Sequence, residues 1–505
     1  MASVSTLPGT QTEHRGLPHW MDRVFKELDK LRNSPDKDAV HDLRVAIRRC
    51  RSVGAVMREV DPDPAWHELR RVPKKLFRKL GELRDAQIMD EWVSEHGAEN
   101  DKLRLLLHDS FQAKEQKLTE EALRIAGKFD EKAWTRLSRK LSKRVRLAPA
   151  GSLAAQCLAV ERFEEAKQLH ARALRAKSPA AWHALRIGLK KFRYTTESLL
   201  PQRYEKWSPM LKKVQDILGE VHDLDVLSGI IKQEVSGEAA NVVPEWERTI
   251  ERERKARLDE YREASIGKKT FWQEWRRGLP QNEKLRAAAI ARLRVTARAT
   301  DAHPRRAAHV SRLAVALFDA LGRAHTAPAF DSPDLRRVLR CASRMCGLKL
   351  KGTGSPQKGA RRFLLSRPVP PSWTPEEWQL LAWSVRYHRG AEPKLENTGF
   401  GRLSEEMQMN VRAIAGVIRL ARGLRKCGIV NCVGLRAERS AAAITVHVPD
   451  LPDSAETAAL LAAAKHLLDS YLGKPLILKP PLKIQVLELP APVEPPMHIT
   501  SVASD

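Results

Sequence analysis

The chain has 505 residues, 42% of them hydrophobic, and its 89 Lys and Arg residues against 62 Asp and Glu residues give a formal net charge of +27. This length predicts two or three domains, each with its own core, and the hydrophobic fraction is that of an ordinary globular protein. So large a positive excess predicts an anionic partner, which leaves nucleic acid, an anionic membrane surface or an inorganic polyanion.

No run approaches the roughly 18 apolar residues of a membrane-spanning helix. The N-terminal stretch MASVSTLPGTQTEH has neither the basic nor the apolar block of a signal peptide. We therefore expect a cytoplasmic protein without a membrane partner.

Residues 18–280 are rich in Leu, Ala, Arg, Lys and Glu, with apolar residues every three or four positions, which predicts an all-helical region. Two Ser-Pro pairs, Ser34-Pro35 and Ser178-Pro179, predict helix starts, with the serine as N-cap and the proline in the first turn.

Two stretches of this region occur twice. VHDLRVAIRRCRS at 40–52 resembles WHALRIGLKKFRY at 182–194, and KKLFRKLGELRDAQIM at 74–89 resembles LKKVQDILGEVHDLDVL at 211–227. Because both pairs are separated by nearly the same number of residues, we expect two homologous halves. Their predicted bounds are about 15–150 and 155–275.

Each repeated helix has a cationic face and an apolar face. At 100° per residue, four basic residues of the first copy fall within about 80° of arc, and the second copy has basic residues at the same offsets. These residues are His41, Arg44, Arg48 and Arg51, then His183, Arg186, Lys190 and Arg193, flanked by Arg49 and Lys191. The opposite faces carry Leu43, Ile47, Cys50, Leu185, Leu189 and Phe192.

A merely solvated helix face would mix both signs of charge. Here Asp42 is the only acid between His41 and Arg58, and none lies between His183 and Arg193. Like charges four residues apart cost roughly 0.2–0.5 kcal/mol each. Phosphate would compensate them, because each charge-assisted hydrogen bond from Arg or Lys contributes about 1.5–3 kcal/mol. The cationic faces therefore predict a row of bound phosphates.

A second helical region is predicted at 285–430. It is followed by a small α/β subdomain at 431–485, with strands at 441–448 and 474–479 around one helix. The proline-rich tail at 486–505 is expected to be disordered.

The repeated His-x-Leu-Arg motifs, each followed by Leu-Gly and an Asp-bearing helix, resemble the CHAD family, the conserved-histidine α-helical domain, over about residues 15–275. The resemblance implies a mainly α fold of tandem antiparallel four-helix bundles with pseudo-twofold symmetry. It also implies a basic central groove or pore that binds inorganic polyphosphate, with one wall from each half.

Carried over residue by residue, the resemblance implies phosphate contacts from both cationic faces and their flanking residues, and second-rank contacts upstream of the Leu-Gly pairs. The first set is His41, Arg44, Arg48, Arg49, Arg51, His183, Arg186, Lys190, Lys191 and Arg193, and the second is Lys75, Arg78, Lys212 and Lys213. Asp85 and Asp223 are expected to orient cations. The basic helix at 136–146 is equally consistent with a further contact or a solvated face. No cofactor is predicted.

Residues 285–480 resemble the C-terminal helical module of exopolyphosphatase/guanosine pentaphosphate phosphatases, a relative of HD hydrolases. The positions of the HD metal ligands hold Arg344, Met345, Ala360 and Arg422, and only His309 remains. The phosphatase catalytic domain has no counterpart in the chain. We therefore expect a degenerate HD-like domain without metal or hydrolytic activity, serving as an anion-binding or docking surface or as a structural module.

Two further motifs have catalytic or metal-binding spacing. Cys341/Cys346 and Cys427/Cys432 repeat a C-x4-C spacing, but the first pair falls in a helical pattern, which disfavours a zinc site. Residues 251–255 match the E-x-E-x-K signature of triphosphate tunnel enzymes, but that chemistry needs a strand and the surrounding composition is helical.

The sequence thus predicts a non-enzymatic polyphosphate-binding protein in the cytoplasm, with polyphosphate granules as a possible location. Two alternatives stay open. One is a nucleic-acid-binding protein, disfavoured because no aromatic residue lies within either cationic stripe to stack on bases. The other is a metal-dependent phosphohydrolase acting on polyphosphate or guanosine pentaphosphate.

Overall fold

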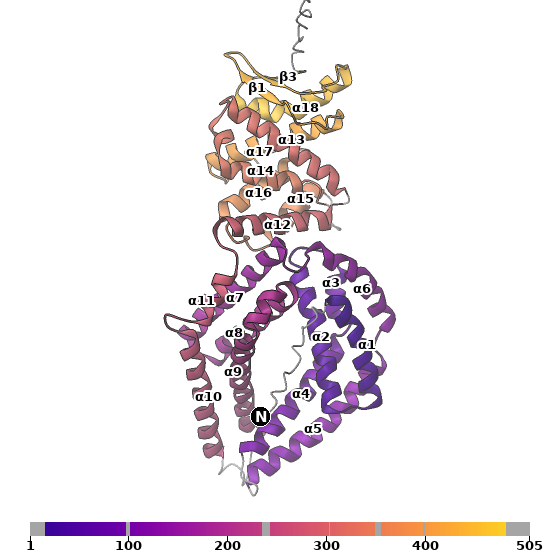
Figure 1. Cartoon of the computed structure of the whole chain (residues 1–505), viewed down its shortest axis with the longest axis vertical. Helices are drawn as coiled ribbons and strands as arrows, with labels where there is room; N and C mark the ends of the chain where they lie inside the picture. Colours follow the sequence, from indigo (N-terminus) through magenta and orange to yellow (C-terminus); the bar gives the residue numbers. More distant parts are fainter. Residues whose placement is uncertain are drawn as a thin grey trace, which may run out of the picture. The chain divides into compact units, whose positions relative to one another are not determined.

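The computed structural model describes residues 16–96, 101–234, 243–301, 303–348, 355–396 and 399–480. Their contacts form two compact units (Figure 1). Of the described residues, one unit comprises those within 1–308 and 337–393, and the other those within 309–336 and 394–505. The fold is mainly helical with one small sheet, as the sequence predicts. The domain boundaries given above stay predictions.

The first unit begins with a set of helices that pack in a fixed order. Helix α2 packs on both α1 and α4, and α4 packs on α5, while α6 covers α1 and α3. The helices are α1 (Leu17–Asn33), α2 (Lys37–Met57), α3 (Ala65–Arg71), α4 (Lys74–His96), α5 (Lys102–Gly127) and α6 (Glu131–Arg144), followed by the short helix η1 (Val145–Leu147).

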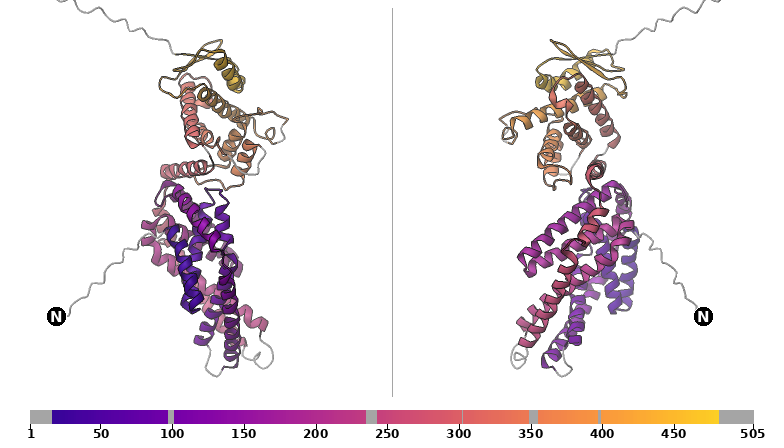
Figure 2. Two further views of the ribbon diagram at one scale, coloured as in Figure 1. Left: turned by 90° about the vertical axis from the view of Figure 1, so that its right-hand side faces the viewer. Right: turned by 60° about the vertical axis from the view of Figure 1, so that its left-hand side comes forward.

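A second set repeats this order. Helix α8 packs on both α7 and α9, and α9 packs on α10 (Figure 2). The set consists of α7 (Leu153–Ala176), α8 (Pro179–Leu199), α9 (Pro201–Glu234), α10 (Val243–Ser265), α11 (Phe271–Gly278) and α12 (Asn282–Thr300). The two repeated sequence stretches thus become α2 with α4 and α8 with α9.

The starts of α2 and α8 use different caps. Ser178 is the N-cap of α8, accepting a hydrogen bond from the backbone N–H of Ala181, with Pro179 as first helical residue, as predicted. The prediction of Ser34 as N-cap of α2 was wrong. The cap is Asp36, whose carboxylate accepts from the backbone N–H of Ala39, and an anionic cap also interacts favourably with the helix dipole.

Both helix sets contribute to shared cores. The larger core includes Leu43 and Ile47 from α2 together with Leu185 and Leu189 from α8. A smaller core joins α4 and α5 to α9 and α10. Its buried residues are Met89, Val93, Leu103, Leu107, Phe111, Leu224, Leu227, Ile231, Trp246 and Ile250. The two sets therefore share parts of their hydrophobic cores.

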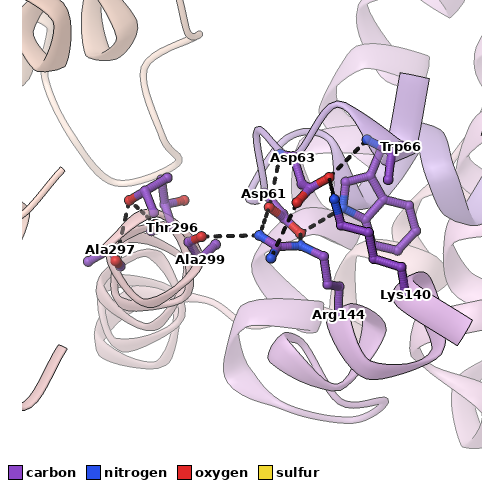
Figure 3. A network of polar contacts seen from close by, with 10 residues as sticks. Asp61, Asp63, Trp66, Lys140, Arg144, Thr296, Ala297 and Ala299 are labelled. Carbon is purple, nitrogen blue, oxygen red and sulfur yellow. Dashed lines mark hydrogen bonds and ion pairs between the residues drawn. The ribbon is translucent and has the colours of Figure 1, made fainter. Parts of the chain in front are cut away.

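Helix α12 is attached to both sets. On one side it packs on α7, where Arg292 Nε lies 2.7 Å from Glu161 Oε1. On the other side Arg144 donates two hydrogen bonds to the fully buried carboxylate of Asp61 and a third, of 3.1 Å, to the carbonyl of Ala299 (Figure 3). Asp61 also accepts a 2.7 Å hydrogen bond from the indole N–H of Trp66.

The remaining elements complete the two units. Helices α14 (Pro333–Met345), α15 (Pro356–Leu365) and α16 (Pro375–Tyr387) lie in the first unit, except for the first turn of α14. Apart from the first residues of α13, the second unit holds α13 (Pro304–Arg323), η3 (Pro328–Asp331), α17 (Glu405–Lys426), β1 (Arg436–Arg439), β2 (Ile444–His447), α18 (Ala455–Leu472) and β3 (Leu476–Lys479).

The small sheet has the order β1-β2-β3, with β1 antiparallel and β3 parallel to β2. Strands β2 and β3 flank α18 as predicted, whereas β1 was not predicted, because its sequence RAER has no β-branched or aromatic residue. The tail predicted to be disordered lies outside the described residues. Among the described helices, none has a stretch apolar and long enough to cross a membrane.

Candidate functional site

The two repeated helices, α2 and α8, pack against each other. The residues of their predicted apolar faces are all buried, with exposed fractions of 2% or less: Leu43, Ile47, Cys50, Leu185, Leu189 and Phe192. The helical periodicity therefore identified the core side correctly. The opposite sides hold the cations.

Two cations from each helix form what we call the central cationic cluster: Arg44 and Arg48 on α2, and Arg186 and Lys190 on α8. All four are partly buried. Burial and the charges of Arg186, Arg48 and Arg44 lower the pKa of Lys190 to about 7. The pKa values of Arg48 and Arg186 are also lowered, chiefly by burial. These mutual effects place the cations of both halves in one neighbourhood.

The cluster has too few carboxylate partners of its own. Among the described residues, Arg48, Arg186 and Lys190 form no ion pair with a carboxylate. The Nε atoms of Arg44, Arg48 and Arg186 are buried and have no hydrogen-bond partner. Because burying a cation without countercharge costs free energy, a bound anion would be stabilised here.

One aspartate from each half borders the cluster. Asp85 on α4 lies 3.7 Å from Arg44 Nη1 and is 66% exposed. Asp223 on α9 is partly buried, and burial raises its pKa to about 6, although the charges of Arg186 and Lys190 act in the opposite direction. The two aspartates therefore compensate only part of the positive charge.

The two motif histidines have different surroundings. His41 is 58% exposed, with Nδ1 3.2 Å from a carboxylate oxygen of Asp42. Nδ1 of His183 lies 3.1 Å from Nδ1 of His222 on α9. Burial and the charge of Arg186 lower the pKa of His183, and lower that of His222 to about 4. Near neutral pH these two rings are uncharged, and one Nδ1–H donates to the other Nδ1. The pair therefore has one remaining N–H donor, on Nε2 of the accepting ring, and no charge.

The flanking residues Arg49 and Lys191 are occupied by other contacts. Arg49 forms an ion pair with Glu197 on α8, and its guanidinium carbon lies 4.5 Å from the ring centroid of Trp20. Lys191 Nζ lies 2.7 Å from Glu165 on α7. Their charges are therefore compensated within the protein, which distinguishes them from the central cationic cluster.

The last arginines of the two motifs also make intramolecular contacts. The guanidinium carbon of Arg51 lies 4.5 Å from the ring centroid of Phe77. Arg193 donates a 2.9 Å hydrogen bond to the side-chain oxygen of Gln215 and lies 3.4 Å from the hydroxyl of Tyr204. These residues join α2 to α4 and α8 to α9, so they also support the positions of the two helices.

The predicted second-rank residues lie on α4 and α9. Lys75 and Lys212 are exposed. Arg78 is paired with Glu82 at 3.6 Å, and Lys213 with Glu260 at 3.0 Å. Among the described residues, none of these four is hydrogen-bonded to a member of the cluster. Helix α4 itself approaches the cluster through Gly81, because a Cβ at this position would lie 3.9 Å from Arg44 Nη2.

Two residues beside the cluster were missed by the sequence reasoning. The ring centroid of Tyr194 lies 5.6 Å from the guanidinium carbon of Arg48, and the Tyr194 hydroxyl is buried without a hydrogen-bond partner. His222 contacts His183. A position-by-position comparison of the repeats could have found His222, because Arg84, also basic, occupies the equivalent position of the first half.

The positions compared with HD metal ligands hold a mixture of buried and polar residues. Met345 and Ala360 are buried, with exposed fractions of 1% and 2%. His309 lies with Nε2 2.9 Å from the carbonyl oxygen of Val430. Arg344 and Arg422 are partly buried. Within the described part of the chain, no group of three or more His, Cys, Asp or Glu residues lies close enough to hold a metal ion.

The other singled-out motifs have structural roles. Residues 251–255 lie inside helix α10, as predicted, so their acidic residues do not alternate along a strand. Cys341 and Cys346 are buried on and just after α14. In the basic helix α6, Lys140 pairs with Asp63 at 2.8 Å and Arg144 with Asp61, so these two cations serve packing (Figure 3).

The geometry defines a helical protein in which two equivalent helices bring together cations that have too few carboxylate partners. Comparison with known families agrees: residues 18–232 match the model of the CHAD domain, and the chain therefore contains a CHAD domain. The crystal structure of the CHAD domain from the plant Ricinus communis is similar at 22% sequence identity, covering 52% of this chain and 88% of that one, with a TM-score of 0.33. No curated protein matches the chain. The HD-like resemblance of residues 285–480 stays a prediction.

Proposed function

We propose that the chain binds inorganic polyphosphate at the central cationic cluster and does not hydrolyse it. The observation that carries this proposal is the meeting of Arg44 and Arg48 with Arg186 and Lys190, partly buried and short of carboxylates. Polyphosphate presents closely spaced charged oxygens, which match a row of guanidinium forks better than isolated anions do. The presence of a CHAD domain, whose family is linked to polyphosphate binding, supports the same ligand.

The proposal includes a shared groove with one wall from each half, built on two homologous antiparallel four-helix bundles. The recurrence of the packing order in the two helix sets supports this arrangement. A polymer in such a groove would contact α2 and α8 together. The hydrogen-bonded pair of His183 and His222 would supply one neutral N–H donor beside the cations.

Nucleic acid is the less favoured ligand. Single-stranded nucleic acids gain about 1–3 kcal/mol from each base stacked on an aromatic ring. Three aromatic rings beside the motif arginines already contact a guanidinium group: Trp20 contacts Arg49, Phe77 contacts Arg51 and Tyr194 contacts Arg48. The site would therefore recognise phosphates without bases.

The residue types support the proposed absence of hydrolysis. Met345 and Ala360 carry no oxygen or nitrogen ligand for a hard or borderline metal ion. The E-x-E-x-K residues lie on a helix. Incubation of the full chain with polyphosphate or guanosine pentaphosphate and Mg²⁺ or Mn²⁺ should release no phosphate. Release that is lost on substitution of His309 would instead establish a phosphohydrolase.

Charge reversal in each half tests the binding proposal. Arg44→Glu/Arg48→Glu and Arg186→Glu/Lys190→Glu should each weaken binding of long-chain polyphosphate at least tenfold, because one polymer must contact both helices. Arg248→Glu/Arg252→Glu is the matched control, since it changes the same charge at the same spacing on the exposed side of α10. Circular dichroism should show unchanged helix content in all three variants.

Two results would contradict the proposal. If the second-half variant bound normally while the first-half variant failed, one groove shared by both halves would be wrong. If tRNA or duplex DNA displaced labelled polyphosphate at physiological salt, the nucleic-acid alternative would be favoured. Co-localisation with polyphosphate granules in cells would test the proposed location.

A further inference from the structure

The hydroxyl of Tyr194 on α8 is a buried polar group that the fold itself does not use. The side chain is 9% exposed, and its hydroxyl oxygen is closed off from solvent. Among the described residues, this oxygen has no hydrogen-bond partner. Buried polar groups are nearly always hydrogen-bonded, because an unpaired one has lost water without replacement and costs free energy in the folded state. The position therefore indicates a role for the hydroxyl other than stability.

Three arginines lie near this phenol. The ring centroid is 5.6 Å from the guanidinium carbon of Arg48. Burial is the largest influence on the pKa values of Arg48, Arg186 and Arg193, and Tyr194 acts against it on all three by favouring the charged form. Guanidinium groups donate hydrogen bonds and accept none. These neighbours therefore cannot accept the O–H of Tyr194, whereas an anion attracted by their charge can.

The first half of the repeat has no equivalent donor. Alignment of the repeated stretches 40–52 and 182–194 places Ser52 opposite Tyr194. The Ser52 hydroxyl already donates a 2.7 Å hydrogen bond to the carbonyl oxygen of Arg48 within α2. Of these two equivalent positions, only the one in the second half therefore has a hydroxyl left for a ligand.

We propose that Tyr194 is a ligand-binding residue of the central cationic cluster, whose phenol O–H donates a hydrogen bond to a phosphoryl oxygen held by Arg48 and Arg186. This inference rests on the function proposed above and adds a neutral donor to its cations. Among the described residues, no carboxylate pairs with Arg48, so its guanidinium can rotate from the ring to the anion and uncover the hydroxyl. The phosphoryl group then satisfies the arginines and the phenol together.

Tyr194→Phe removes a single oxygen atom and tests the proposal. Calorimetry with long-chain polyphosphate should give an affinity about tenfold lower, because the lost O–H donates to a charged oxygen. Tyr261→Phe is the matched control, since the hydroxyl of this fully buried tyrosine on α10 lies 2.8 Å from Nδ1 of His170. This variant should change the affinity less than twofold. Equal affinities of the two variants would overturn the proposal.

The same two variants should change stability in opposite directions. Without ligand, Tyr194→Phe should raise the thermal midpoint of unfolding by about 2 °C, because it removes an unpaired buried hydroxyl. Tyr261→Phe should lower the midpoint, because His170 loses its hydrogen-bond partner. A tyrosine with a purely structural role would lose stability on substitution. A lower midpoint for Tyr194→Phe would therefore overturn the proposal.

A spectroscopic measurement locates the ligand at the phenol. The chain has five tyrosines, so incorporation of fluorotyrosine gives few fluorine resonances, and the one lost in Tyr194→Phe belongs to Tyr194. This resonance should shift when polyphosphate is added to the full chain, and an unchanged resonance would contradict the proposed contact.

The role of Tyr194 and the function proposed above can fail separately. If Arg44→Glu/Arg48→Glu weakens polyphosphate binding while Tyr194→Phe does not, only the role of Tyr194 is wrong. If the charge reversal leaves binding unchanged, the central cationic cluster is not the site, and the role of Tyr194 is wrong with it.

Discussion

Binding of a polyanion at the central cationic cluster should be accompanied by proton uptake at Lys190. Burial and neighbouring cations lower the pKa of this ammonium group to about 7. At pH 8 about 90% of the free protein would then carry a neutral Lys190, whereas an adjacent phosphate oxygen favours the charged form and raises the pKa again. Complex formation should therefore take up about 0.9 proton at pH 8 and about 0.1 proton at pH 6 from this residue.

The same linkage sets the pH dependence of affinity. Above the free-protein pKa of Lys190, affinity should fall as the pH rises, by at most about tenfold per pH unit, because each binding event must first recover a proton. Calorimetric titrations in Tris and HEPES, which differ in ionisation enthalpy, measure the number of protons taken up.

Two substitutions distinguish Lys190 from its neighbours. Lys190→Arg keeps its charge at every pH in this range and should abolish the uptake at pH 8 while retaining binding. Lys191→Arg should leave the uptake unchanged, because Lys191 is already paired with Glu165. Asp223, with a pKa of about 6, is ionised in the free protein at pH 8. Uptake near zero in the unsubstituted chain, or equal uptake in Lys190→Arg, would refute the placement of the polyanion beside Lys190.

The logarithm of polyphosphate affinity should fall linearly with the logarithm of salt concentration, by analogy with counterion release from DNA, and a flat response in fluorescence anisotropy would exclude the cationic cluster as the site. Lys190→Met should raise the thermal midpoint of unfolding more at pH 6 than at pH 9, because the lowered pKa of Lys190 makes folding less favourable while its side chain is charged, and this cost shrinks as the pH rises from the folded-state pKa to the unfolded-state pKa. Equal shifts of the midpoint in scanning calorimetry at the two pH values would contradict the lowered pKa. Asp61→Ala should lower the free energy of unfolding, measured by chemical denaturation, by about 3–5 kcal/mol, because Arg144 and the Trp66 N–H lose their shared buried partner. A decrease below about 1 kcal/mol would show that the surrounding residues rearrange to compensate for the lost carboxylate.

The burial of the helix faces could be predicted from sequence because it follows the helical period. Leu43 and Ile47 lie one turn apart on α2, and both are fully buried. The family resemblance grouped Arg49 with the phosphate contacts, and the structure pairs it with Glu197 on α8. Nothing local to α2 identifies that partner, since it depends on which helix packs alongside.

The N-cap of α2 could not be identified from the sequence, because two nearby residues fit the capping pattern. Ser34-Pro35 has the form of a helix start, yet Asp36 two residues later caps α2. Both residues can cap, and only the path of the preceding chain decides between them. The lowered pKa of Lys190 likewise required the tertiary structure, because it arises from burial and from arginines on two different helices.

Helix α12 has a consequence for how this domain can be moved between proteins. The family match ends at residue 232, and a fragment cut there keeps all four residues of the central cationic cluster. It would nevertheless lose Arg292, whose side chain is 2% exposed and lies against Glu161, a carboxylate whose pKa is already raised by burial. It would also uncover the side of α7 on which α12 packs. A transplantable module therefore has to extend at least to the end of α12 at Thr300, well past the boundary that sequence comparison assigns to it.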